Sequence, residues 1–189
     1  IFEGGHRVPL IAKWPSVVKA GTTADAIVGL QDLYATFAEL TGQPVAKDQG
    51  LDSESFLATL KSGQSPPERS TLFAQAKNED HHGQRLMKMV REGDWKLITT
   101  KGLKPTHLFH LKGDPAETKN QLKHPDQQKR ISRMLAELKR IMNSERSTPA
   151  FTPKAETISV AQLFAPQTSL SMKVKASKNG KVEQVGGKW

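Results

Sequence analysis

The chain has 189 residues with no cysteine, a formal net charge of +9, and 36% hydrophobic but only 6% aromatic residues. These numbers exclude disulfides, thiolate metal sites and a cysteine nucleophile within the chain, and no apolar run reaches the roughly 20 residues of a membrane helix. The positive charge favours acidic partners such as sulfated or phosphorylated polymers, or equally a solvated basic surface. Nucleic acid is disfavoured because no helix concentrates Lys and Arg. We expect neither a nucleic-acid nor a membrane partner.

The first third of the chain predicts one strand and two helices. The apolar run of residues 8–14 follows a Gly-Gly turn and predicts a buried strand. Apolar residues at helical spacing predict an amphipathic helix over residues 27–40, which Gly42 ends. A short helix is expected over residues 55–60. A surface loop with Gly and Pro, residues 61–69, follows it.

The middle of the chain predicts an antiparallel sheet covered by a helix. The runs rich in β-forming residues are 71–76, 86–91, 95–99 and 107–111. We expect residues 77–84 to form a polar loop and Gly93 to lie in a tight turn. Residues 126–142 place apolar side chains on one helical face, which predicts a helix packed on the sheet.

The composition changes from about residue 147, where Lys, Thr, Ser and Pro replace the periodic apolar positions. Residues 171–185 alternate around Asn179-Gly180, which is a hairpin signal. This tail is expected to be a basic extension or a truncated β-module.

Several segments, in order along the chain, are similar to motifs of sulfatases of the arylsulfatase type. They are residues 3–9 (EGGHRVP), 13–15 (KWP), 31–42 (QDLYATFAELTG), 51–56 (LDSESF), 89–98 (MVREGDWKLI) and 108–120 (LFHLKGDPAETKN). Since they cover residues 1–143 with sensible spacing, the chain resembles the C-terminal part of such an enzyme. The departures are Ala35 for Pro, Ser53 for Gly, and Phe109 and His110 for Tyr and Asp. All fall at packing or turn positions.

The resemblance implies an α/β fold of the alkaline-phosphatase-like type, in which a large sheet domain precedes a small α+β domain. Residues 1–69 would then be the end of the large domain, residues 70–146 the small domain with its antiparallel sheet and C-terminal helix, and residues 147–189 the extension. A strand and helices without most of their sheet leave apolar faces uncovered. We therefore expect residues 1–60 to be poorly stable alone.

The family resemblance also implies where the chemistry lies. Its nucleophile is a formylglycine made from Cys or Ser in a C/S-x-P-x-R motif, and its metal is usually calcium held by Asp and Asn oxygens. Lys and His bind the sulfate, and all of these groups precede the EGG motif. We therefore expect no catalytic residue and no metal ligand within this chain, and no activity from it alone. Ser65 begins a bare S-x-P-x-R match, but in a Pro-rich loop far from the family's position, so we do not expect it to be catalytic.

Near the expected site, Gly4 and Gly5 are predicted to allow positive φ and a close backbone approach. Arg7 is expected to form a structural ion pair rather than to bind substrate. His6 occupies a variable family position and is not expected to be catalytic.

The loop of residues 78–83 is a second candidate, because the resemblance places the small domain beside the substrate cleft. His81 and His82 would contact an anionic leaving group or a metal, or simply form part of an exposed polar loop. The remaining histidines, His107, His110 and His124, are expected to be structural.

The function implied is a sulfuric ester hydrolase that cleaves R–O–SO₃⁻ with formylglycine and calcium, acting on an aryl sulfate or a sulfated polysaccharide. One alternative is a phosphonate or phosphodiester hydrolase of the same superfamily. Another is a non-catalytic basic module or remnant that binds anionic glycans. The family is typically periplasmic or extracellular, although no signal peptide is visible here. The sequence does not indicate an oligomeric state.

Overall fold

A computed structural model of the chain describes residues 1–46, 48–63, 71–80 and 83–144. Contacts divide the chain into Ile1–Thr157 and Ile158–Trp189, and the second unit lies wholly outside the described residues. The predicted tail hairpin of residues 171–185 and the Ser65 motif lie outside them as well. No helix in the described ranges is both long and apolar enough to cross a membrane.

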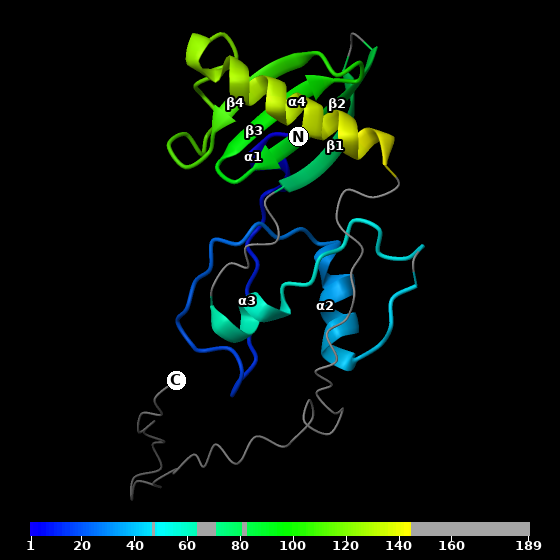
Figure 1. Cartoon of the computed structure of the whole chain (residues 1–189). Helices are drawn as coiled ribbons and strands as arrows, with labels where there is room; N and C mark the ends of the chain where they lie inside the picture. The colour runs from blue at the N-terminus through cyan, green and yellow to red at the C-terminus, as the bar shows by residue number, and fades with distance from the viewer. Residues whose placement is uncertain (47, 64–70, 81–82, 145–189) are drawn as a thin grey trace, which may run out of the picture. The chain divides into compact units, whose positions relative to one another are not determined.

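Four strands form one antiparallel sheet in chain order (Figure 1). They are β1 (Thr71–Asp80), β2 (Gly83–Glu92), β3 (Trp95–Thr100) and β4 (Pro105–His110). Gly93, at φ 53°, turns the chain between β2 and β3 in the left-handed region that glycine tolerates. The register pairs Val90 with Leu97 and Leu97 with Leu108, so these side chains lie side by side on one face. The predicted antiparallel sheet is confirmed.

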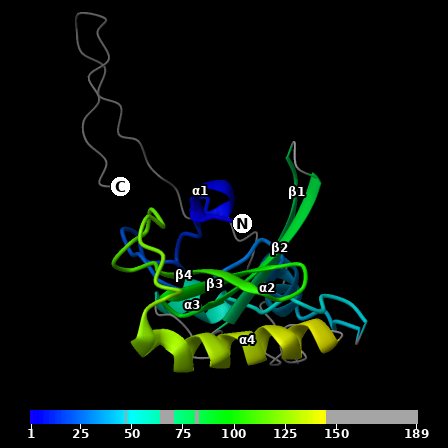
Figure 2. The ribbon, with the colours of Figure 1, turned by 90° about the horizontal axis from the view of Figure 1, so that it is seen from above.

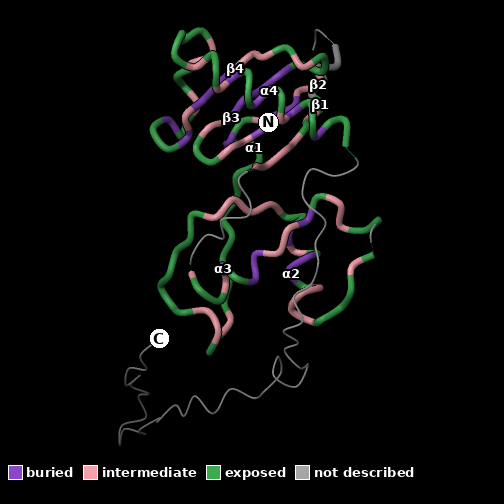
Figure 3. The backbone as a smooth tube through the Cα atoms, in the orientation of Figure 1, coloured by how far each residue is buried: buried purple, intermediate pink, exposed green. Residues whose placement is uncertain are grey.

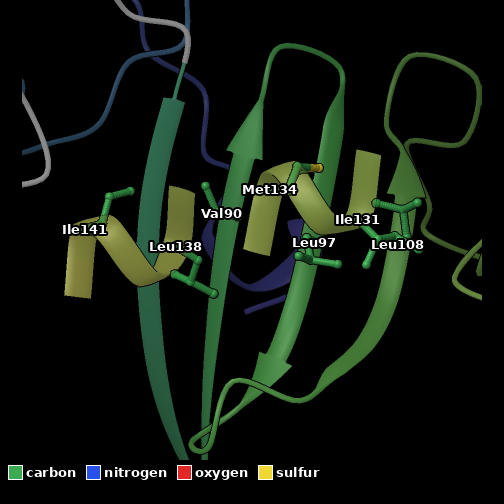
Figure 4. Packing of buried hydrophobic residues seen from close by; sticks show 7 residues of the cluster. All are labelled: Val90, Leu97, Leu108, Ile131, Met134, Leu138 and Ile141. Atoms are coloured by element: carbon green, nitrogen blue, oxygen red, sulfur yellow. The ribbon is translucent and has the colours of Figure 1, made fainter. Parts of the chain in front are cut away.

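That face is covered by α4 (Gln128–Asn143), which follows the short η1 (Pro125–Gln127). The helix contributes Ile131, Met134, Leu138 and Ile141 to a core shared with the three strand residues above (Figure 4). Met134 and Leu138 are completely buried. Their helical spacing explains why this helix was predictable from the sequence.

The opposite face of the sheet carries a second apolar cluster. Met89, Ile98, Phe109 and Leu111 form it, and Ile1 packs against it. The one-turn helix α1 (Glu3–His6) lies on this side of the sheet and α4 on the other (Figure 2). The centre of the sheet is therefore buried on both faces, and buried residues concentrate in β2, β3, β4 and α4 (Figure 3).

The predicted polar loop of residues 77–84 is instead largely strand. The ladder between β1 and β2 continues through Asn78 with Arg85 to Asp80 with Gly83. Continued main-chain pairing outweighs the polar side chains, which disfavour a strand only weakly.

The helix predicted over residues 27–40 begins later, as α2 (Asp32–Thr41), and the short helix over 55–60 lies at α3 (Leu57–Ser62). The Asp32 carboxylate accepts the Gly29 N–H at 2.6 Å, which fixes a turn just before α2. Gly42 ends α2 as predicted, with φ 66°.

The predicted buried strand over residues 8–14 is wrong. No strand forms there, and Val8, Leu10 and Ile11 are 64%, 54% and 89% exposed. A strand requires a hydrogen-bonded neighbour, and none of the described residues supplies one. Apolar side chains of α2 and its approach are also exposed, namely Leu30, Tyr34 and Phe37. The poor stability expected of residues 1–60 alone remains a prediction.

Two departures from the sulfatase pattern contact each other. The buried Ala35 N–H donates to Ser53 Oγ at 2.9 Å, and Ser53 Oγ donates to the Gln31 carbonyl at 2.7 Å. The sulfatase pattern has Pro at position 35, which has no N–H to donate. It has Gly at position 53, which has no hydroxyl to accept a hydrogen bond. Ala35 therefore adds a donor for which Ser53 adds the acceptor.

We expect Ser53→Gly to lower the free energy of unfolding by about 1 to 3 kcal/mol, because it leaves the buried Ala35 N–H without this acceptor. In the Ala35→Pro background the same change should cost at least about 1 kcal/mol less. A double-mutant cycle from urea unfolding measures this coupling. Additive costs would show that the two positions are independent.

Candidate functional site

A buried lysine lies at the centre of the candidate site. Lys96, on β3, is completely buried on the same face as Ile98. Its Nζ donates to Glu3 Oε1 at 3.0 Å and lies 2.8 Å from Glu117 Oε1, an ion pair without hydrogen-bond alignment. One ammonium therefore pairs with carboxylates from two distant parts of the chain.

Glu3 is held through its main chain as well. Its N–H donates to Glu117 Oε2 at 2.6 Å, and both carboxylates are almost fully buried. Glu3 Oε2 has no hydrogen-bond donor among the described residues, and Arg7 Nη1 is 3.9 Å away from it. The row Glu117, Lys96, Glu3 and Arg7 alternates in charge.

A turn after β4 presents Glu117. Asp114 accepts the N–H groups of Thr118 and Lys119 at 3.0 and 2.8 Å, and these hydrogen bonds lower the pKa of its carboxyl. Glu117 itself has φ 55°, a conformation in which glycine is usual. Glycine would adopt this backbone conformation more readily, but it has no carboxylate to pair with Lys96.

Asn120 anchors the same turn to the sheet. Its Oδ1 accepts the Leu108 and Leu122 N–H groups at 3.0 Å each, and its Nδ2 donates to the Thr106 carbonyl at 3.0 Å. The segment that resembled the sulfatase motif thus contributes an Asp that shapes the turn, a Glu that binds Lys96 and an Asn that fixes the turn to β4.

His6 completes the cluster. Its Nε2 lies 3.2 Å from Lys96 Nζ and 3.2 Å from the Ile1 carbonyl. Burial, and then the charge of Lys96, lower the pKa of His6 below 6.5, although Glu3 opposes this. The neutral imidazole ring of His6 can accept a hydrogen bond from the Lys96 ammonium through Nε2.

This lowered pKa predicts a pH dependence of stability. His6 binds a proton more readily in the unfolded chain, so its contribution is complete above pH 6.5 and is lost as the pH falls towards the lowered pKa of the folded state. His6→Gln should reduce the loss of stability over this window. Urea unfolding of the wild type and His6→Gln from pH 7.5 to 5 measures the free energy of unfolding of each. Identical pH profiles would show that His6 does not cause the loss of stability. The comparison is needed because burial also lowers the pKa of His107.

The predicted conformation of Gly4 and Gly5 is wrong. Neither has positive φ, because both lie in α1, closed by Gly5 N–H to the Phe2 carbonyl and Arg7 N–H to the Glu3 carbonyl, each 2.9 Å. A Cβ on either glycine would meet nothing within 4 Å. The structural ion pair expected of Arg7 remains a prediction, with Glu3 as the nearby carboxylate.

His81 and His82 lie outside the described residues. The ring centroid of His107 lies 5.5 Å from that of Phe2 and 5.5 Å from that of Phe109. The ring centroid of His110 lies 4.7 Å from that of Trp95. In the described ranges no three His, Cys, Asp or Glu residues form a group that could hold a metal. The ammonium of Lys96 already lies between the Glu3 and Glu117 carboxylates and would repel a second cation, so this pair does not fit a calcium site.

Sequence reasoning missed Lys96, Glu3 and Glu117 as a unit. A signal was present, since Lys96 lies within the short β-forming run of β3 and is followed directly by Leu97 and Ile98, and a charge buried in such a strand requires a partner. The partners could not be identified, because Glu3 is 93 residues away from Lys96.

Comparison with known proteins identifies the family. Residues 1–144 match the family described as N-sulphoglucosamine sulphohydrolase, C-terminal. An N-acetylgalactosamine-6-O-sulfatase of Bacteroides thetaiotaomicron is 28% identical over 153 residues, which cover 73% of this chain and 28% of that protein. Human steryl-sulfatase is 33% identical over 72 residues, covering 38% of this chain and 12% of the enzyme.

Solved structures agree on the fold. A protein solved in complex with its substrate D-glucosamine-2-N,6-O-disulfate superimposes with a TM-score of 0.59 at 22% identity, covering 69% of this chain and 27% of that one. A putative sulfatase from Bacteroides thetaiotaomicron superimposes with a TM-score of 0.50 at 24% identity. The match covers 59% of this chain and 24% of that one. The predicted fold class, a sulfatase fragment that includes a small α+β domain, is confirmed. This chain spans about a quarter of the length of these proteins. It belongs to the N-sulphoglucosamine sulphohydrolase C-terminal family and is a C-terminal part of a sulfatase.

Proposed function

We propose that the protein to which this chain belongs hydrolyses sulfate esters of saccharides, with a formylglycine nucleophile and calcium supplied from outside residues 1–189. The family match over residues 1–144 carries this proposal. Cleavage of a sulfate ester needs a nucleophile, a cation to offset the charge of the ester, and donors around the sulfuryl oxygens. The described residues contribute structure rather than these groups.

Two of the similar proteins support a sugar as the substrate class. The match that covers most of this chain among the named relatives is an N-acetylgalactosamine-6-O-sulfatase, and an ulvan-active sulfatase of Formosa agariphila matches half of it. The match to steryl-sulfatase covers 38% of the chain. A net charge of +9 also suits a polyanionic substrate.

Sulfate release tests the proposal. The whole protein and residues 1–189 alone should be incubated with calcium and, in turn, glucosamine-2-N,6-O-disulfate, N-acetylgalactosamine-6-sulfate and an aryl sulfate. We expect the whole protein to release sulfate, faster from the sugars, and residues 1–189 to release none.

Other outcomes separate the alternatives. Hydrolysis of a phosphodiester or phosphonate without sulfate release would replace the proposed reaction by that of a related hydrolase. Salt-sensitive binding of a sulfated polymer without any turnover, lost on deletion of residues 147–189, would indicate a glycan-binding module. Turnover by residues 1–189 that Ser65→Ala abolishes would contradict the assignment of the nucleophile.

A further inference from the structure

Lys96 joins two parts of the chain that are distant in sequence. Its ammonium contacts the Glu3 carboxylate at 3.0 Å and the Glu117 carboxylate at 2.8 Å, and Glu117 also accepts the Glu3 N–H at 2.6 Å. Glu3 is thus held by its side chain and by its main chain at once. A shift of the N-terminal segment along the sheet would break these contacts together.

Apolar contacts fix the residues next to Glu3. Ile1 packs against the cluster that contains Met89, Ile98 and Phe109, and the Phe2 ring meets the Phe109 ring at 6.2 Å. The N-terminal segment is therefore held to the sheet by apolar contacts and by buried charge.

Lys96 itself is not available to an anionic substrate. Its side chain is completely buried, and two carboxylates already neutralise its charge. An influence on the reaction must therefore pass through the residues that Lys96 holds.

We propose that Lys96 and Glu117 are positioning residues of the sulfatase: they fix the polypeptide at Glu3 and thereby place the small sheet domain against the catalytic part of the protein. This inference rests on the proposed function. Under the proposed function the nucleophile and calcium come from outside residues 1–189, and the chain spans 28% of the N-acetylgalactosamine-6-O-sulfatase. Displacing a reacting group by about 1 Å can lower the rate on the order of 100-fold.

The first experiment measures the contact itself by hydrogen exchange in the whole protein, without any activity. Glu117→Ala removes the acceptor of the Glu3 N–H, whereas Glu117→Gln keeps an oxygen in its place. We expect the Glu3, Gly5 and Arg7 amides to exchange at least about tenfold faster in Glu117→Ala, the factor that loss of one such hydrogen bond implies, and near the wild-type rate in Glu117→Gln. Lys96→Met should act like Glu117→Ala, and the Glu117 pair decides the test if Lys96→Met does not fold.

The second experiment measures kcat and KM of the whole protein on a sulfated sugar, per folded molecule. We expect Glu117→Ala to lower kcat on the order of 100-fold with a smaller change in KM, and Glu117→Gln to recover most of it. Leu138→Ala, in the core beneath α4, destabilises the domain from the other face and should leave kcat per folded molecule unchanged.

Each result then has one meaning. An active wild type whose Glu117→Ala variant keeps its kcat overturns the positioning role alone. Unchanged exchange at Glu3 in that variant overturns the contact that the role requires. A wild type that releases no sulfate overturns the proposed function and the positioning role with it, while the exchange experiment still reports whether the contact exists.

Discussion

Lys96→Met should lower the free energy of unfolding by about 3 to 5 kcal/mol, the usual cost of removing one partner from a buried ion pair. The side chain of Lys96 is fully buried, and its loss removes the cation that lies between the Glu3 and Glu117 carboxylates. A cost of this size is a large fraction of the 5 to 15 kcal/mol by which a domain is typically stable. Urea unfolding followed by circular dichroism measures it.

Two control proteins separate charge from packing. Lys112→Met changes an exposed lysine near the same turn and should alter the free energy of unfolding by less than about 0.5 kcal/mol. Adding Glu3→Gln and Glu117→Gln to Lys96→Met removes the unpaired charges and should recover most of the loss. A Lys96→Met protein as stable as the wild type would show that the ammonium is not needed to offset the carboxylates.

Leu138→Ala should lower the free energy of unfolding by about 2 to 5 kcal/mol, through lost burial and the cavity that remains. Leu138 is completely buried between α4 and the sheet, in the same cluster as Val90 and Leu97 (Figure 4). Since rigid strands form one wall of this core, the site has little freedom to collapse around the smaller side chain.

The neighbouring residue provides the control for the helix itself. Lys139→Ala, one position along on the exposed face of α4, should change the free energy of unfolding by less than about 0.5 kcal/mol. Thermal unfolding of both variants measures the difference. Equal melting temperatures for Leu138→Ala and Lys139→Ala would contradict the packing of α4 on the sheet.

The parts of the fold that the sequence predicted well are those whose signals are local. The turn at Gly93 and the helical spacing of Ile131, Met134 and Leu138 lie within short windows, so β2, β3 and α4 could be placed within a few residues. The strand predicted over residues 8–14 failed for the opposite reason, because a strand depends on a neighbour that the described residues do not contain.

The candidate site was harder to predict because long-range contacts assemble it. Gly4 and Gly5 suggested a left-handed turn, yet the same residues form one helical turn held at Glu3. Nothing near Glu3 in the sequence indicates Lys96 or Glu117. The family motifs marked all three residues, but only the structure shows that they bind one another.

The contact between Glu3 and Lys96 joins residues that are 93 positions apart, and this separation predicts an order of folding. Closing so long a loop costs conformational entropy before any contact repays it, and the receiving face exists only once β3 and β4 have paired. Docking of the N-terminal segment should therefore follow formation of the sheet. During synthesis Glu3 leaves the ribosome before Lys96 and Glu117, so it must wait for both of these partners to be made.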